Sequence, residues 1–232
     1  MESNNKRQFV KYSFYQVEPT WRRLPDKEKE EGKKQLLAVL DEFSSKTLLR
    51  SYSLVGVRGD ADFLLWQATE ELDCIQEMAT RVWRTGLGRY LRQPYSYLAM
   101  TRGSQYLGGH KHPGQEGARL KISPSDAKYF IVYPFVKTRP WYLMSKEERQ
   151  KMMNVHFKIG HKYPSVKINT TYSFGLDDQE FVLAFETDSP SDFVDLVMEL
   201  READASLYTL RDVPSFTCVR RSFSETLESL GG

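Results

Sequence analysis

The chain is short of cysteine, of long apolar stretches and of excess charge. Only two of its 232 residues are cysteines, and without CxxC spacing Cys74 and Cys218 are predicted to be unpaired, buried thiols. No apolar run approaches the about 18 residues that span a bilayer, and residues 1–7 lack the apolar segment of a signal peptide. The 33 basic and 31 acidic side chains nearly balance, which favours neither nucleic acid nor a membrane as a partner. We therefore expect a cytoplasmic protein.

The chain contains enough hydrophobic residues to form one or two hydrophobic cores, and parts of its sequence are repeated. Its composition, 40% hydrophobic and 28% charged, is typical of a folded globular protein. Residues 9–14 (FVKYSF) recur as 130–135 (FIVYPF), and residues 60–66 (DADFLLW) recur as 178–184 (DQEFVLA). Such self-similarity, at separations of 121 and 118 residues, implies two related halves.

Each half has the pattern strand, helix, strand, strand, helix, strand. Period-two runs predict strands and a 3.6-residue apolar period predicts helices; in the first half these elements are 8–17, 26–43, 48–56, 62–68, 72–90 and 96–101. In the second half they are 129–137, a helix opened by Ser145, 166–174, 180–186, 191–201 and a last strand near Phe216. Ser145 and Glu148 have the spacing of a capping box, which marks the helix start.

Two such βαββαβ units predict an α+β protein. We expect two tandem ferredoxin-like units with antiparallel sheets, forming a dimeric α+β barrel-type subunit. The expected boundaries are an N-terminal ferredoxin-like domain (1–102), a linker (103–128), a C-terminal ferredoxin-like domain (129–219) and a tail (220–232). His110 and His112 in the linker can chelate a metal, but no nearby carboxylate or thiol completes a four-ligand set. The sequence therefore favours no dedicated metal site there.

His156 stands out in the second half. A shift of about 120 residues between the halves places it opposite Leu36, an apolar helix position. Its helical neighbours include Met152, Met153 and Ile159, which puts the imidazole on the apolar stripe that faces the core. A hydrogen-bonded core histidine explains this placement, and so does an axial ligand for haem iron, because a neutral imidazole in an apolar surround binds iron well. Helical spacing leaves both interpretations open.

One face of the strand 129–137 carries a phenol and an ammonium. With period two, Tyr133 and Lys137 lie on the same face, about 13 Å apart. The corresponding residues of the first half are Tyr12 and Gln16. The tyrosine therefore fits a packing position common to both halves, and only the lysine is new. The strand alone does not decide whether Tyr133 packs or reacts.

Several motifs, in one order, resemble a known family. In the second half they are 133–137 (YPFVK), 141–145 (WYLMS), 147–149 (EER), 153–156 (MNVH) and 175–178 (GLDD), and in the first half 52–63 (YSLVGVRGDADF). Over about residues 8–219 the chain resembles the chlorite dismutase superfamily of haem proteins. The co-occurrence of all these motifs in order is specific.

The resemblance implies a haem site in the C-terminal half, with His156 as the proximal iron ligand, and a ring-shaped homo-oligomer, commonly a pentamer. Chlorite dismutases carry a distal arginine on the strand before the GLDD turn, where this chain has Ile168. They also carry a glutamate that holds the proximal histidine, where this chain has Ala205. An arginine can pair with an anionic oxychlorine species and a butyl side chain cannot. Both differences argue against chlorite chemistry.

The coproheme decarboxylase branch of the superfamily is more similar to the chain. Its YPxxK motif matches Tyr133 and Lys137, its propionate-binding arginine matches Arg119, and its serine after the last helix matches Ser206. Distal residues vary in that branch, so Ile168 is compatible with it. The resemblance implies that coproheme (iron coproporphyrin III) is both substrate and redox centre and that haem b is the product. Other haem-pathway enzymes are candidate partners.

In the implied reaction, hydrogen peroxide is the oxidant and two propionate carboxyls leave as carbon dioxide. The oxidising equivalent passes from the iron to Tyr133, whose phenoxyl radical takes a hydrogen atom from the propionate β-carbon, while Lys137 orients the carboxylate and can donate a proton. The expected porphyrin-binding residues are Arg119, Tyr133, Lys137, Ile168 and Ser206. Two alternatives remain open: a chlorite-dismutase-like haem peroxidase, and a non-catalytic haem-binding ferredoxin-like protein.

Overall fold

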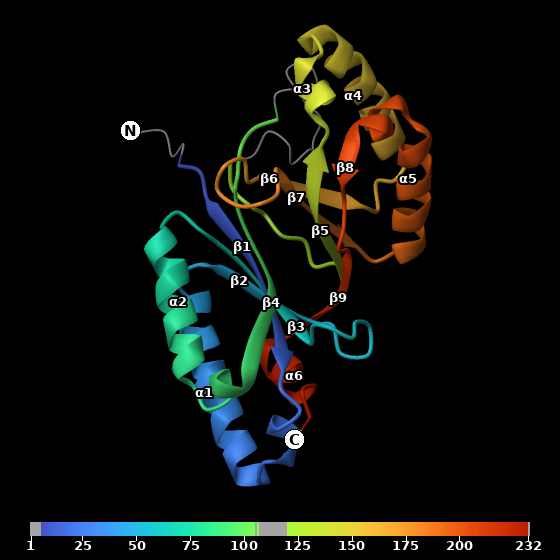
Figure 1. Cartoon of the computed structure of the whole chain (residues 1–232). Helices are drawn as coiled ribbons and strands as arrows, with labels where there is room; N and C mark the ends of the chain where they lie inside the picture. The colour runs from blue at the N-terminus through green and yellow to red at the C-terminus, as the bar shows by residue number, and fades with distance from the viewer. Residues whose placement is uncertain (1–5, 105, 107–119, 232) are drawn as a thin grey trace. The chain divides into compact units, whose positions relative to one another are not determined.

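The computed structural model describes residues 6–104, 106 and 120–231, and the chain divides into two compact units (Figure 1). Unit 1 consists of Met1–Met100 and Phe216–Gly232, and unit 2 of Thr101–Ser215. The chain thus leaves unit 1 once and returns to it near the C-terminus. Within the described residues, no helix is both long and apolar enough to cross a membrane.

Unit 1 is a βαββαβ unit with one additional strand. Its elements are β1 (Phe9–Val17), η1 (Trp21–Arg23), α1 (Asp26–Ser44), β2 (Leu48–Ser53), β3 (Phe63–Thr69), α2 (Leu72–Arg84), η2 (Gly88–Tyr90) and β4 (Leu91–Met100). The strands pair antiparallel in the order β4-β1-β3-β2, which is the ferredoxin-like arrangement predicted from the sequence. In this register Tyr12 lies between Trp66 on β3 and Tyr97 on β4.

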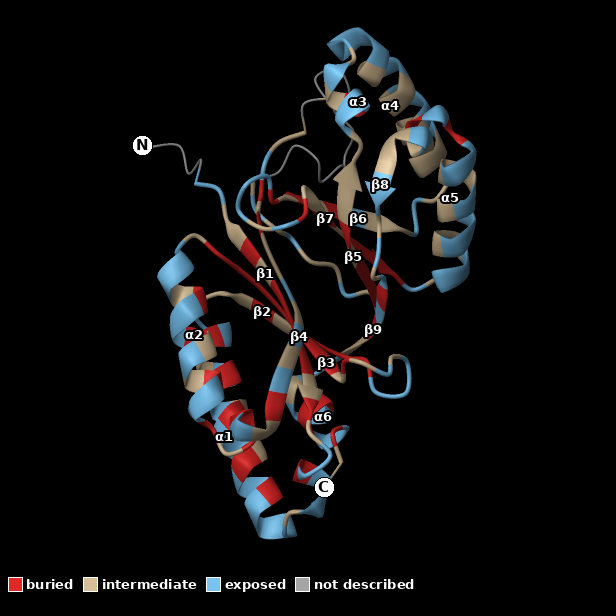
Figure 2. Cartoon of the chain, viewed as in Figure 1, coloured by how far each residue is buried: buried red, intermediate tan, exposed pale blue. Residues whose placement is uncertain are grey.

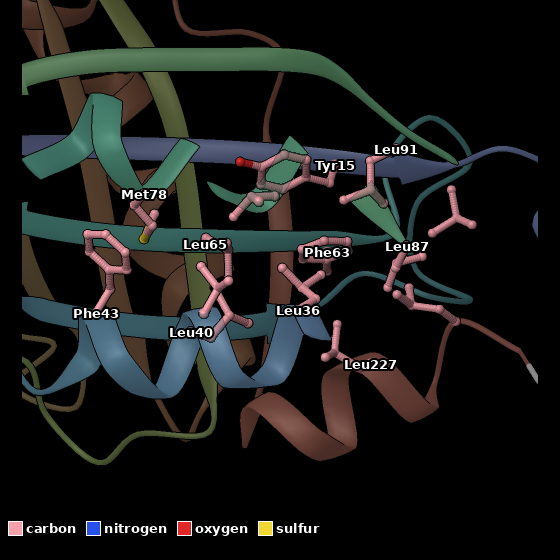
Figure 3. Close-up of a cluster of buried hydrophobic side chains, with 14 of the residues drawn as sticks. Tyr15, Leu36, Leu40, Phe43, Phe63, Leu65, Met78, Leu87, Leu91 and Leu227 are labelled. Atoms are coloured by element: carbon pink, nitrogen blue, oxygen red, sulfur yellow. The ribbon is translucent and has the colours of Figure 1, made fainter. Parts of the chain in front are cut away.

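Helices α1 and α2 close one face of this sheet around a continuous core (Figure 3). α1 contributes apolar residues at helical spacing, Leu36, Leu40 and Phe43, each at most 1% exposed. They join strand and helix residues in one buried cluster, which includes Tyr15, Phe63, Leu65 and Met78. Burying an apolar side chain of this size contributes about 1.5–3 kcal/mol, so this face of unit 1 is used for stability.

The C-terminal segment belongs to unit 1, which corrects the expected boundary at residue 219 and assigns the tail. β9 (Phe216–Arg221) pairs antiparallel with β2, with Ser51 opposite Arg221. α6 (Phe223–Glu228) follows, and its Leu227 enters the core cluster. The physical reason is that β2 would otherwise present unpaired backbone groups on that side.

Unit 2 repeats the arrangement of unit 1. Its elements are β5 (Tyr129–Lys137), α3 (Arg139–Leu143), α4 (Lys146–Gly160), β6 (Lys167–Tyr172), β7 (Phe181–Thr187), α5 (Pro190–Glu202), η4 (Asp204–Tyr208) and β8 (Thr209–Arg211). The strand order is β6-β7-β5-β8, all antiparallel. The strand predicted near Phe216 is therefore not the last strand of this unit, because the short β8 takes that place. The α+β class with two ferredoxin-like units is confirmed.

Local chemistry explains where one predicted helix stops. The helix expected over residues 72–90 ends at Arg84, and η2 follows. Thr85 Oγ1 accepts a 2.9 Å hydrogen bond from the Gly88 N–H, and a Cβ at Gly88 would meet the Val82 carbonyl oxygen at 1.9 Å. The chain therefore turns where only glycine fits.

Of two smaller predictions, the capping box is confirmed and the burial of both cysteines is confirmed only for Cys218. Ser145 and Glu148 form the predicted capping box at the start of α4. Cys74 and Cys218 are both free thiols, Cys218 fully buried and Cys74 half-buried.

Candidate functional site

The sheet face of unit 2 that carries Tyr133 is lined with aromatic and apolar side chains. Tyr133 lies opposite Leu183 on β7, and Ile131 lies opposite Phe185, which in turn lies opposite Ile168 on β6. Directly opposed residues of an antiparallel sheet point to the same face. Tyr133 and Ile168 therefore share one face. The Tyr133 ring stacks on Phe185 with the ring centroids 5.7 Å apart.

The helices of unit 2 pack less tightly against this sheet face than α1 and α2 pack against the sheet of unit 1. α4 contains no buried residue and α5 contains one, Leu196, whereas α1 contains six, among them Leu36. Figure 2 shows the contrast, with α4 in tan and pale blue and red bands along α1. The nearest neighbours of α4 are α5 and η4, while α1 approaches β2. As a result Ile168 is 39% exposed, and apolar surface is left for a ligand.

His156 lies on α4 and is half-buried. Burial, with a smaller contribution from the Lys137 ammonium, lowers its pKa to about 4, so the imidazole is neutral at physiological pH, the form that binds metals. Among the described residues it makes no hydrogen bond, and its ring meets Phe157 edge-on with centroids 6.2 Å apart. The expectation of a core-facing histidine is met only in part, because no core closes around it.

Lys137, the last residue of β5, holds its ammonium over a ring and against a carbonyl. Its Nζ lies 4.6 Å from the centroid of Trp141, a favourable cation–π geometry, and donates a 2.7 Å hydrogen bond to the main-chain oxygen of Ala205. Burial lowers the pKa of Lys137 to about 8, and the Glu180 carboxylate opposes that shift. Lys137 is also near enough to His156 to affect its charge state. The structure thus brings Lys137, His156 and Ala205 into one neighbourhood.

The Tyr133 phenol is half-buried and protonated. Burial, helped by the Asp212 carboxylate, raises its pKa well above the usual value, and Arg201 opposes this. Arg201 and Asp212 are themselves an ion pair, with Nη2 and Oδ2 2.6 Å apart. Among the described residues no hydrogen bond is made by the Tyr133 hydroxyl. The hydroxyl can therefore turn to a bound ligand.

The remaining predicted residues are placed differently. Ser206 lies on η4, where its hydroxyl donates a 2.8 Å hydrogen bond to the Arg201 carbonyl oxygen. Arg119 and the linker histidines His110 and His112 lie outside the described residues. Across the part of the chain that the structure describes, no group of three or more His, Cys, Asp or Glu side chains could hold a metal ion.

Sequence reasoning missed two polar residues beside Lys137. Glu180 accepts hydrogen bonds from the Lys137 main-chain N–H and from the Tyr142 hydroxyl. Both residues lie in or beside the motifs that carry the resemblance, Tyr142 in WYLMS and Glu180 two residues after GLDD. A signal was therefore present, but only the fold brings the two motifs together.

Comparison with known proteins gives the family. A chlorite dismutase family profile matches residues 29–221. A coproheme decarboxylase of Mycolicibacterium smegmatis is 33% identical over 180 residues, which is 77% of this chain and 75% of that protein. A coproheme decarboxylase of Staphylococcus carnosus is 31% identical over 231 residues, which is 93% of this chain and 92% of that protein.

Solved structures show the same fold. A mutant chlorite dismutase from Candidatus Nitrospira defluvii superposes with a TM-score of 0.88 at 24% identity, over 97% of this chain and 96% of that one. A haem-binding protein from Thermus thermophilus superposes with a TM-score of 0.84 at 24% identity, over 96% and 94%. These structures show that the chain has the same fold, and the family profile and the two coproheme decarboxylases show which family it belongs to. The chain belongs to the chlorite dismutase family.

Proposed function

We propose that the protein is a coproheme decarboxylase, which uses hydrogen peroxide to convert iron coproporphyrin III into haem b. The observation that carries the proposal is the position of Tyr133 and Lys137 on β5, with a neutral His156 near Lys137 on α4, a helix that has no buried residue. Two relatives of that name, similar over most of the chain, support it.

The residues of unit 2 fit a large flat porphyrin with carboxylate arms. The aromatic sheet face around Phe185 offers apolar surface, and His156 offers a neutral nitrogen that no described residue engages. The buried Tyr106 hydroxyl has no hydrogen-bond partner among the described residues. Four propionates require cationic and hydroxyl partners; Lys137 supplies the cation, and Ser206 supplies the hydroxyl by turning from the Arg201 carbonyl to the propionate.

When bound, the porphyrin iron supplies the redox chemistry with hydrogen peroxide as oxidant. Each reacting propionic acid arm loses carbon dioxide and two hydrogen atoms to become a vinyl group, and peroxide is reduced to two water molecules, so atoms and electrons balance. His156 would bind the iron through its neutral imidazole. Tyr133 gives up its phenolic hydrogen atom and then takes one from the propionate β-carbon. Its raised pKa keeps that hydrogen in place until oxidation.

Lys137 pairs with the reacting carboxylate and supplies a proton. With a pKa of about 8 the amine is mostly protonated at neutral pH and can still exchange a proton during turnover, as a general acid must. Its hydrogen bond to the Ala205 carbonyl holds the ammonium in place before the substrate arrives. The same lysine therefore binds substrate and takes part in the chemistry.

Three further residues complete the proposed porphyrin site. Arg119, which lies outside the described residues, and Ser206 bind propionates, and the exposed Ile168 contacts the macrocycle. We also propose that the protein is a homo-oligomer.

The proposal is tested with iron coproporphyrin III, peroxide and mass spectrometry of the porphyrin. The wild-type protein is expected to yield haem b. Tyr133→Phe is expected to bind the porphyrin and to lower the rate of conversion at least about 100-fold. Tyr12→Phe, which removes a phenol from the first strand of unit 1, should convert at the wild-type rate. Full turnover in Tyr133→Phe would contradict the mechanism, and an unchanged porphyrin mass in the wild type would remove the function.

A second variant separates binding of iron from chemistry. His156→Ala is expected to lose axial coordination, seen as a shift of the porphyrin absorption band, which free imidazole restores. Oxygen release from chlorite that outpaces decarboxylation in the wild type would instead favour a chlorite-dismutase-like activity, against which Ile168 and Ala205 both argue.

A further inference from the structure

The turn between β6 and β7 places an acidic residue against the end of β5. The turn passes through Gly175, whose φ of 72° is a backbone conformation that glycine adopts readily. The buried Gln179 donates hydrogen bonds to Ser173 Oγ (3.1 Å) and Asp177 Oδ2 (3.0 Å). The Ser173 N–H donates to the Glu180 carbonyl oxygen at 2.8 Å. The backbone of Glu180 is therefore fixed independently of its side chain.

One carboxylate oxygen of Glu180 accepts two hydrogen bonds. The donors are the Lys137 main-chain N–H at 2.8 Å and the Tyr142 hydroxyl at 2.5 Å. Lys137 ends β5 and Tyr142 lies on α3, so this single oxygen spans the connection between the two elements. Hydrogen bonds to a charged acceptor are about twice as strong as neutral ones. Residues 137–142 are thus held at both ends by one side chain.

The connection held by Glu180 contains the surroundings of the Lys137 ammonium. Trp141, on which the ammonium rests, is only 3% exposed and contacts Tyr208 of η4 with ring centroids 5.7 Å apart. The strand ladder cannot fix the position of Lys137 alone, because the register to β8 is irregular between Val136 and Lys137. An irregular strand end of this kind leaves backbone groups that need another partner. Glu180 is the partner of the Lys137 N–H.

We propose that Glu180 is a positioning residue for Lys137. Its carboxylate fixes the irregular end of β5, and with it the place of the ammonium between the Trp141 ring and the Ala205 carbonyl. Glu180 acts through Lys137 and touches no substrate. The placement of the ammonium depends only on contacts within unit 2, and its importance for turnover rests on the proposed function. The role of the GLDD turn is then to present Glu180.

The test compares three variants of the full chain. Glu180→Ala removes the acceptor, and Glu180→Gln keeps an acceptor oxygen of similar reach while removing the charge. Asp178→Asn is the matched control, because Asp178 lies in the same turn, is exposed, and makes no hydrogen bond with Lys137 or Tyr142. Unfolding temperatures from circular dichroism establish that each variant is folded.

The first measurement is the acetylation rate of Lys137 in ligand-free protein, relative to the exposed Lys146, by peptide mass spectrometry. Glu180→Ala is expected to raise this ratio about tenfold, since the hydrogen bonds that hold the Lys137 main chain and the Tyr142 hydroxyl are both lost. Glu180→Gln should stay within about threefold of the wild type, and Asp178→Asn should not change. A folded Glu180→Ala protein with the wild-type ratio overturns the proposal. Glutamine that behaves like alanine overturns it too, because an acceptor would then not suffice to hold Lys137.

The second measurement is turnover of iron coproporphyrin III with peroxide. Glu180→Ala is expected to lose about tenfold in kcat with KM changed less than about twofold, and Glu180→Gln to recover most of the loss. Faster acetylation of every lysine with a lower unfolding temperature would mean a general loss of structure and would overturn a specific role. If the wild-type protein does not turn over, the proposed function fails. The acetylation ratio, measured without ligand, still shows whether Glu180 holds Lys137 in place.

Discussion

The two units share one order of elements and one order of strands, but they use the space between helices and sheet differently. In unit 1 that space is a core, with Leu36 fully buried on α1. In unit 2 the corresponding helix, α4, has no buried residue. A repeated fold therefore needs only one closed copy for stability, and the other can keep an apolar face for a ligand.

Leu36 on α1 and His156 on α4 occupy corresponding positions of the two units, and they show the difference in packing most directly. The leucine is packed from all sides, and the histidine is half-buried without a hydrogen bond to the described residues. A neutral, unengaged imidazole on a loosely packed helix is a poor way to stabilise a fold and a good way to hold a ligand atom.

Truncation of the matched pair is the strongest test of the comparison. Leu36→Ala is expected to lower the free energy of unfolding by about 3 kcal/mol, because it leaves a cavity in a closed core. His156→Ala should lower it by less than about 1 kcal/mol in the ligand-free protein at neutral pH. Urea denaturation measures both. Equal losses would mean that unit 2 is packed as tightly as unit 1.

Added iron coproporphyrin III should remove much of the difference between the units. At a hundredfold excess over its dissociation constant, a ligand that binds only the folded state stabilises it by about 2.7 kcal/mol. Hydrogen exchange of α4 and α5 is expected to slow, while exchange of α1 and α2 stays constant. Mass spectrometry of exchanged peptides reports this. Equal slowing of all four helices would contradict a site confined to unit 2.

A smaller effect is expected from acid. The pKa of His156 is lowered from 6.5 to about 4 in the folded protein, so between these values the unfolded chain binds a proton that the folded chain does not. Stability is therefore lost as pH falls through this range and is fully present above it. At pH 5, about 1.5 units below the pKa of the unfolded chain, His156→Leu should remove about 2 kcal/mol of that loss. Urea denaturation across this range measures it, and parallel curves for variant and wild type would contradict the assignment.

The smallest effect concerns Tyr12 and Tyr133, one tyrosine on the first strand of each unit. Tyr12 is fully buried and stacks with Trp66, with ring centroids 6.3 Å apart. Tyr12→Phe is expected to cost about 1 kcal/mol of stability, and Tyr133→Phe about half of that or less in the ligand-free protein. Thermal unfolding compares the two. A larger loss for Tyr133→Phe would indicate that its hydroxyl already has a structural task.

Much of this fold could be predicted because its signals are local. Alternation in residues 129–137 and the Ser145–Glu148 capping box depend on neighbours in sequence, and both elements form as expected. The placement of residues 216–221 could not be predicted, because strand pairing with β2 depends on which sheet edge is free in three dimensions. Periodicity gives a strand its faces but not its partner.

The candidate site shows the same division. Helical spacing placed His156 on an apolar stripe, but spacing cannot show whether a helix packs tightly against its sheet, and α4 does not. Glu180 escaped prediction because its partners, Lys137 and Tyr142, are distant in sequence and meet it only through the pairing of β5 with β7. A residue that positions another side chain has no sequence pattern that would identify its partner.

The return of the chain to its first unit has a consequence for synthesis. Unit 1 contains residues from both ends, and unit 2 is the segment between them. During translation the sheet of unit 1 must wait for β9, which leaves the ribosome only after every residue of unit 2 has been made. Unit 2 is thus available to fold before unit 1 is complete, and β9 and α6 are the last elements to join unit 1.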